Sequence, residues 1–74
     1  MNEIKAELTA AKTHVMLNGH ETTVDNVEQI QGLITHALSC ADDNDKEALE
    51  STLDAIDAIK VPGWDLTSGA RAKL

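Results

Sequence analysis

The sequence predicts an all-α fold, a small helical hairpin or three-helix unit that pairs into a dimeric helical bundle. In three separate stretches, apolar residues recur at spacings of three and four, which places them on one side of a helix. The chain has no Phe or Tyr and a single Trp, so its core must be largely aliphatic, which suits helices better than a sheet. Its 74 residues form at most one domain, expected over residues 1–61, with a flexible C-terminal tail over 62–74.

The expected homodimer follows from the small size of the chain. One core in a domain of this length supplies only roughly 3–5 kcal/mol. Cys40 is the only cysteine, so an internal disulfide is excluded, and no zinc-finger pattern is present. Oligomerisation is the remaining common source of stability for such a chain.

The first helix is predicted over about residues 3–17. Asn2 is a candidate N-cap, and Gly19 is expected to end the helix in the left-handed conformation that glycine adopts without penalty. Residues 12–17 also alternate in polarity, so a short strand is an alternative, although no partner strand is evident. The apolar side of the helix consists of Ile4, Leu8, Ala11 and Val15.

The second helix, over about residues 24–41, is the most apolar run in the chain. Thr22 or Thr23 can cap its start. Gly32 in its interior costs about 1 kcal/mol relative to alanine, which predicts that another helix approaches closely there. The core or dimer contacts expected from this helix are Val27, Ile30, Leu33, Ile34 and Leu38.

The third helix, over about residues 45–60, is strongly amphipathic. Asn44 or Asp45 can cap it. Its expected core residues are Leu49, Leu53 and Ile56, with Ile59 at the edge. The opposite face carries a second stripe, made of Glu47, Glu50, Asp54 and Asp57. This acidic stripe is interpreted as a docking surface for a basic protein, and the alternative is a solvated face with no partner.

Val61, Pro62 and Gly63 end the third helix. The following residues show no periodicity, which predicts a mobile end. Trp64 lies just past the helix, where it is either an exposed hot spot for a partner or a cap on the bundle core.

Charge narrows the classes of partner. The net charge is −7, and residues 21–57 carry ten acidic residues against one lysine. A nucleic-acid backbone repels such a chain, so no direct nucleic-acid binding is expected and a basic protein is the natural partner. No run reaches the roughly 18 apolar residues needed to cross a membrane. The free cysteine and the lack of a signal peptide predict the cytoplasm.

Candidate chemical sites are weak. His36 and Cys40 lie four apart on one helix and could share a metal ion, but His14 or His20 would have to supply further ligands. The simpler interpretation is a surface histidine and a buried thiol. As a Cys–His nucleophile pair they lack a third residue and an oxyanion site. Residues 42–47 resemble a calcium loop without its glycine and are explained by helix capping. We therefore expect no catalytic residues, no metal site, no cofactor and no enzymatic activity.

Two segments resemble a known family. Residues 8–19 (LTAAKTHVMLNG) and 33–38 (LITHAL) are similar to the small AriR/YmgB-type biofilm and acid-resistance regulators of enteric bacteria. The similarity covers roughly residues 8–59, with a longer loop after Gly19 and no counterpart for the tail. The resemblance implies an all-α dimer without enzymatic activity that regulates stress and biofilm genes by contacting other proteins. The alternative function is a phage- or plasmid-borne inhibitor whose acidic surface blocks a host nucleic-acid-binding protein.

Overall fold

The computed structural model describes residues 1–74, and it confirms the all-α prediction. No strand is present, and residues 12–17 belong to a helix. The elements in chain order are α1 (Asn2–Asn18), a short 3-10 helix η1 (Gly19–Glu21), α2 (Val24–Asp42), α3 (Lys46–Ala58) and α4 (Ser68–Lys73).

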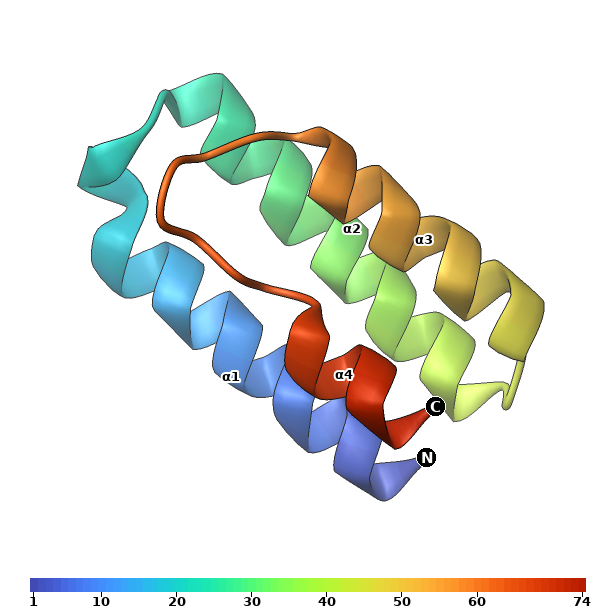
Figure 1. Ribbon diagram of the computed structural model, residues 1–74. Helices are drawn as coiled ribbons and strands as arrows, with labels where there is room; N and C mark the ends of the chain where they lie inside the picture. Colours follow the sequence, from blue (N-terminus) through green and yellow to red (C-terminus); the bar gives the residue numbers. More distant parts are fainter.

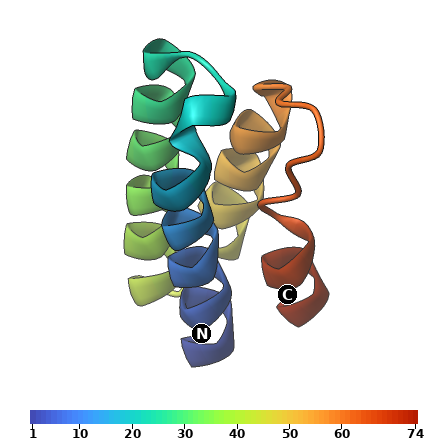
Figure 2. The same cartoon turned by 90° about the vertical axis from the view of Figure 1, so that its left-hand side faces the viewer.

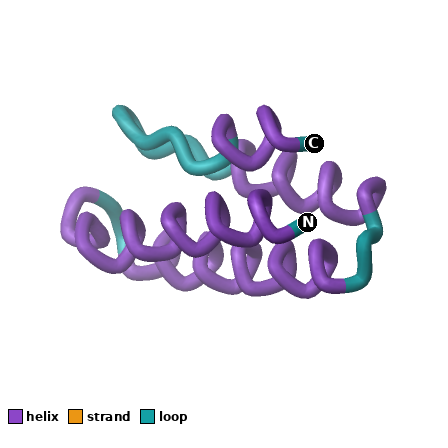
Figure 3. The backbone as a smooth tube through the Cα atoms, turned by 90° about the horizontal axis from the view of Figure 1, so that it is seen from below, coloured by secondary structure: helices purple, strands orange, loops and turns teal.

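The first three helices run up, down and up along a molecule measuring 32 × 17 × 16 Å (Figure 1). Seen from the side, α2 packs against both α1 and α3, and the C-terminal segment lies on the side of α1 and α3 away from α2 (Figure 2). The tube in Figure 3 shows that α4 and the loop before it lie alongside the three long helices. None of the helices is both long and apolar enough to cross a lipid bilayer.

All four α-helices contribute to one hydrophobic core. The aliphatic stripes of α1, α2 and α3 meet in its centre, where Leu8, Ile34 and Leu53 have no exposed surface. Each of these side chains gains roughly 1.5–3 kcal/mol from leaving water. Val27, Leu33 and Leu38 are only partly buried at its edge. The other expected core residues are buried: Ala11, Val15, Ile30, Leu49 and Ile56.

Helix ends follow the expected capping chemistry at two places. The Thr23 hydroxyl accepts a hydrogen bond from the Asn26 backbone N–H at 3.1 Å, and Asp45 does the same for Ala48 at 3.1 Å. These contacts satisfy backbone donors that have no partner within the helix. The loop between α2 and α3 is closed by Asn44, which has a positive φ of 54°.

Two glycines differ from expectation. Gly19 does not end α1 in the left-handed conformation, because its φ is −58° and the chain continues directly into η1. A β-carbon at Gly19 would lie 3.3 Å from the Val27 side chain, so a glycine here allows η1 to approach α2. Gly32 faces open space, so no helix of the same chain explains its lack of a side chain.

The C-terminal segment, predicted to be a flexible tail, contains a helix that packs against the bundle. After Gly63, whose φ is +84°, the chain turns back along the bundle, and Ser68–Lys73 form α4 against α1. Ala70 joins the hydrophobic core with 1% exposure, and Thr67 is 3% exposed. Six residues are too few for a repeating pattern, and contacts with distant residues hold the segment in place.

Candidate functional site

The acidic stripe of α3 has two parts, which differ in whether a cation of the same chain pairs with them. Glu47 and Glu50, in its first half, are exposed and have no cation within ion-pair distance. The neighbouring Asp43 is likewise exposed and unpaired. We call Asp43, Glu47 and Glu50 the free acidic face, because their negative charge is offered to solvent.

The second half of the stripe is occupied by the chain's own arginine. The Arg71 guanidinium donates from Nη2 to Asp54 Oδ1 and to Asp57 Oδ2, each at 2.8 Å. The hydrogen bonds from Arg71 to Asp54 and Asp57 raise the pKa of the guanidinium above its ordinary value. Asp54 and Asp57, predicted as partner contacts, are therefore already bound within the chain.

Thr67 strengthens this contact from the start of α4. Its hydroxyl donates to Asp57, whose two carboxylate oxygens lie 2.8 and 2.9 Å away. Because Thr67 is buried, the Asp57 carboxylate satisfies a hydroxyl that has little access to water. Arg71 Nε also lies 3.4 Å from the Thr67 oxygen, so one cluster joins α3 to α4.

Asp65 fixes the turn that leads into α4. It accepts hydrogen bonds from the Ser68 hydroxyl at 2.6 Å and from the Ser68 backbone N–H at 3.2 Å. These contacts stabilise the ionised carboxylate, and the Ser68 hydroxyl has the largest effect in lowering the pKa of Asp65 below 3.8. These hydrogen bonds therefore hold the turn from Asp65 to Ser68, where α4 begins.

Trp64 connects the C-terminal segment to the other end of α1. Its indole N–H donates to Glu21 at 2.8 Å, and its ring meets the His14 ring edge to face, with centroids 5.2 Å apart. The residue is half-buried and packs against the core, so the structure favours the capping role over a bare aromatic hot spot. His14 Nε2 is buried there without a hydrogen-bond partner.

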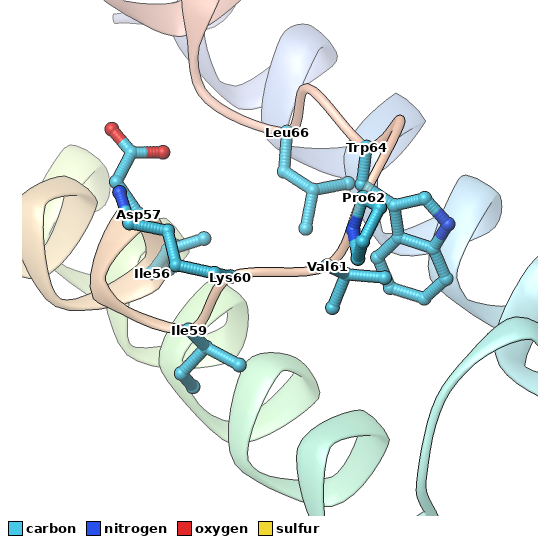
Figure 4. A pocket seen from close by; sticks show the side chains of 8 residues that line it. All are labelled: Ile56, Asp57, Ile59, Lys60, Val61, Pro62, Trp64 and Leu66. Atoms are coloured by element: carbon cyan, nitrogen blue, oxygen red, sulfur yellow. The ribbon is translucent and has the colours of Figure 1, made fainter.

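A hollow of about 440 Å³ lies where the chain leaves α3. Figure 4 shows the side chains around it, which come from the last turn of α3 and from the loop that carries Trp64. Most of its walls are aliphatic, including Ile56, Ile59 and Leu66, and Lys60 brings the one cationic group.

The residues singled out for metal chemistry do not meet. His36 is exposed on α2 while Cys40 is buried on the core side of the same helix. No group of three or more His, Cys, Asp or Glu side chains is arranged to hold a metal ion. The acidic residues between α2 and α3 act in the turn, with Asp45 capping α3.

Sequence reasoning missed the partners of the acidic stripe. Thr67 and Arg71 lie 10 and 14 residues after Asp57, beyond any helical spacing. One signal existed: Arg71 and Lys73 are basic residues that follow a strongly acidic region, and opposite charges in one short chain favour pairing. The exposed apolar side chains of Met16, Leu17 and Val24 were also not anticipated.

No family model, curated protein or solved structure matches this chain.

Proposed function

We propose that the chain is a non-enzymatic regulatory protein that binds basic proteins through its free acidic face. The process suggested by the family resemblance is stress and biofilm gene regulation in the bacterial cytoplasm. The observation that carries the proposal is that Glu47 and Glu50 remain exposed and unpaired, while Arg71 pairs with Asp54 and Asp57 and offsets part of the charge on the other half of the stripe. Direct binding to nucleic acid is not part of the proposal, because the net charge is −7.

Electrostatics gives this face a defined role. Exposed carboxylates attract a basic surface over distances of about 10 Å at moderate salt and accelerate encounter more than they add affinity. Its Glu47 and Glu50 lie on α3, whose Leu49 and Leu53 are fully buried, so both carboxylates project from a helix that is anchored in the core. A basic protein would therefore meet a charge pattern that is already in place.

A double charge reversal tests the proposal. Glu47→Lys with Glu50→Lys is expected to reduce capture of basic proteins from a bacterial lysate roughly tenfold, because attraction becomes repulsion. The matched control is Asp25→Lys with Glu28→Lys, which makes the same charge change at exposed, unpaired residues of α2. Asp54 and Asp57 are left intact, since changing them would also release Arg71.

Quantitative mass spectrometry of the captured proteins, with circular dichroism to verify folding, provides the measurement. If the Glu47/Glu50 variant retains the same proteins as the wild type, the face is merely solvated and the proposal fails. If the lost proteins bind nucleic acid and DNA competes with this chain for them, the inhibitor alternative is favoured.

We also propose that two copies pair through the end of the bundle where α1 passes into α2. Met16, Leu17 and Val24 there are 66%, 71% and 72% exposed, which leaves apolar surface available to a second copy. The charges of α1 balance, so this helix adds no net repulsion between two copies. A single chain already buries Ile34, so the dimer is not required to cover the core.

Sedimentation equilibrium tests this pairing. The wild type is expected to sediment as a dimer at micromolar concentration, and Met16→Glu with Leu17→Glu as a single chain, because the added charges would be buried. Gln29→Glu with Thr35→Glu adds the same charge at exposed positions of α2 and should remain dimeric. A wild-type monomer at this concentration would contradict the pairing.

A further inference from the structure

The C-terminal segment, defined as residues 64–74, packs against α1 through α4 and binds α3 through Thr67 and Arg71 (Figures 1 and 2). We call the surface that α1 and α3 offer to this segment the groove. Both apolar and polar contacts attach it to the rest of the chain, and Trp64, Leu66 and Leu74 pack against the core. Arg71 and Thr67 bind the second half of the acidic stripe, and Trp64 donates to Glu21. Lys73 lies 3.9 Å from Glu3. Only Thr67 and Ala70 of the segment are buried.

The polar part of this attachment is weak, and the helix itself is costly to form. A helix as short as α4 does not form alone in water, and ion pairs at the surface contribute little to stability. The Arg71 side chain is 37% exposed and that of its partner Asp54 is 73% exposed, so water screens their attraction. The segment stays docked because the chain tethers it beside its site, at an effective concentration in the millimolar range.

The groove also has a defined shape. A β-carbon at Gly69 would overlap the Glu7 carboxylate of α1, and Ala70 is 1% exposed. A helix at this site therefore needs a small residue in the place of Ala70 and an arginine toward Asp54 and Asp57. A residue larger than glycine in the place of Gly69 requires the Glu7 side chain to move. In α4 these requirements are met by three consecutive residues, Gly69, Ala70 and Arg71.

We propose that this groove is the docking site for a short helix of the basic partner, and that α4 occupies it as an internal substitute until the partner displaces it. The proposal rests on the proposed function, because it specifies which element of a basic protein binds. The displacing helix carries an arginine after a small residue and reaches Asp54 and Asp57. The free acidic face on the same helix then guides the partner toward the groove.

A basic partner is favoured over the same segment of a second copy. Asp54 and Asp57 attract a strongly basic segment more than the same segment of a second copy, in which Asp65 offsets part of the charge of Arg71 and Lys73. The turn before the segment is also closed by a hydrogen bond of 3.1 Å from the Trp64 backbone N–H to the Val61 carbonyl oxygen. Gly63 within this turn has a φ of +84°. Exchange between copies would require this turn to open in both chains.

The test uses the full chain and a fluorescein-labelled peptide with the sequence of residues 66–74, which contains no tryptophan. Arg71→Ala in the chain weakens the internal substitute, so we expect the peptide to bind this variant roughly three- to tenfold more tightly than the wild type. Lys46→Ala removes the same charge at a residue without an ion pair and should leave the affinity unchanged.

Two further readouts separate docking from general charge attraction. A peptide with the substitution Ala70→Leu has the same charge but a side chain too large for the buried position, and it should lose measurable binding. In the wild type, the unmodified peptide should shift the emission of Trp64 as the segment leaves His14 and Glu21. Equal affinities for wild type and Arg71→Ala, or equal binding of both peptides, would overturn the proposal.

Failure of this proposal can be distinguished from failure of the proposed function. If the peptide experiments fail while the Glu47/Glu50 reversal still removes basic partners, the groove proposal is wrong and the acidic docking surface stands. If the reversal has no effect, the proposed function fails whatever the peptide does, and peptide binding then shows only self-recognition by α4.

Discussion

Replacing Ile34 by alanine is expected to leave a large fraction of the chain unfolded at room temperature. Ile34 has no exposed surface, and truncation of such a side chain costs about 2–5 kcal/mol through lost burial and a residual cavity. That cost is comparable to the roughly 3–5 kcal/mol that a core of this size supplies. Circular dichroism during urea unfolding should show a strongly lowered midpoint or no native baseline.

Leu38→Ala is the matched control for this prediction. Leu38 lies one turn further along α2 but is only partly buried at the edge of the core. Its truncation removes a similar volume where water can enter, so the loss should be less than half as large. Equal effects of the two substitutions would contradict the packing described for α2.

Replacing Asp57 by alanine is expected to lower the free energy of unfolding by about 1–2 kcal/mol. The substitution leaves the buried Thr67 hydroxyl without its acceptor and removes one of two contacts to Arg71. The C-terminal segment should loosen first, which changes the environment of Trp64. Urea unfolding followed by both circular dichroism and tryptophan emission measures the two effects together.

Asp54→Ala controls for the loss of a negative charge on the same helix. Asp54 contacts Arg71 but no buried group, and its side chain is 73% exposed, so its removal should cost less than about 1 kcal/mol. If Asp54→Ala proved as costly as Asp57→Ala, the buried Thr67 hydroxyl would not be the source of the effect.

The three long helices could be predicted from the sequence because each buries a stripe with helical spacing. Ile4, Leu8 and Val15 on α1 repeat at intervals that only a helix places on one side, and burial enforces that pattern. Thr23 and Asp45 likewise mark helix starts through local hydrogen bonds. These signals lie within a few residues of the feature they predict.

The C-terminal segment could not be predicted in this way, because distant contacts determine it. Trp64 binds Glu21, which lies 43 residues earlier, and Arg71 binds Asp54 across 17 residues. The same contacts divided the acidic stripe into a free half and an occupied half, although its four acids look alike in the sequence. Gly32, expected beneath another helix, instead faces open space.

Residues 64–73 are held in the groove between α1 and α3, where Arg71 binds Asp54 and Asp57. Backbone ¹⁵N relaxation of the full chain measures this most directly. Order parameters near 0.85, as in a rigid backbone, are predicted for this segment as well as for α3. Values that fall below about 0.6 from Gly63 onward would show a free tail and would contradict the account.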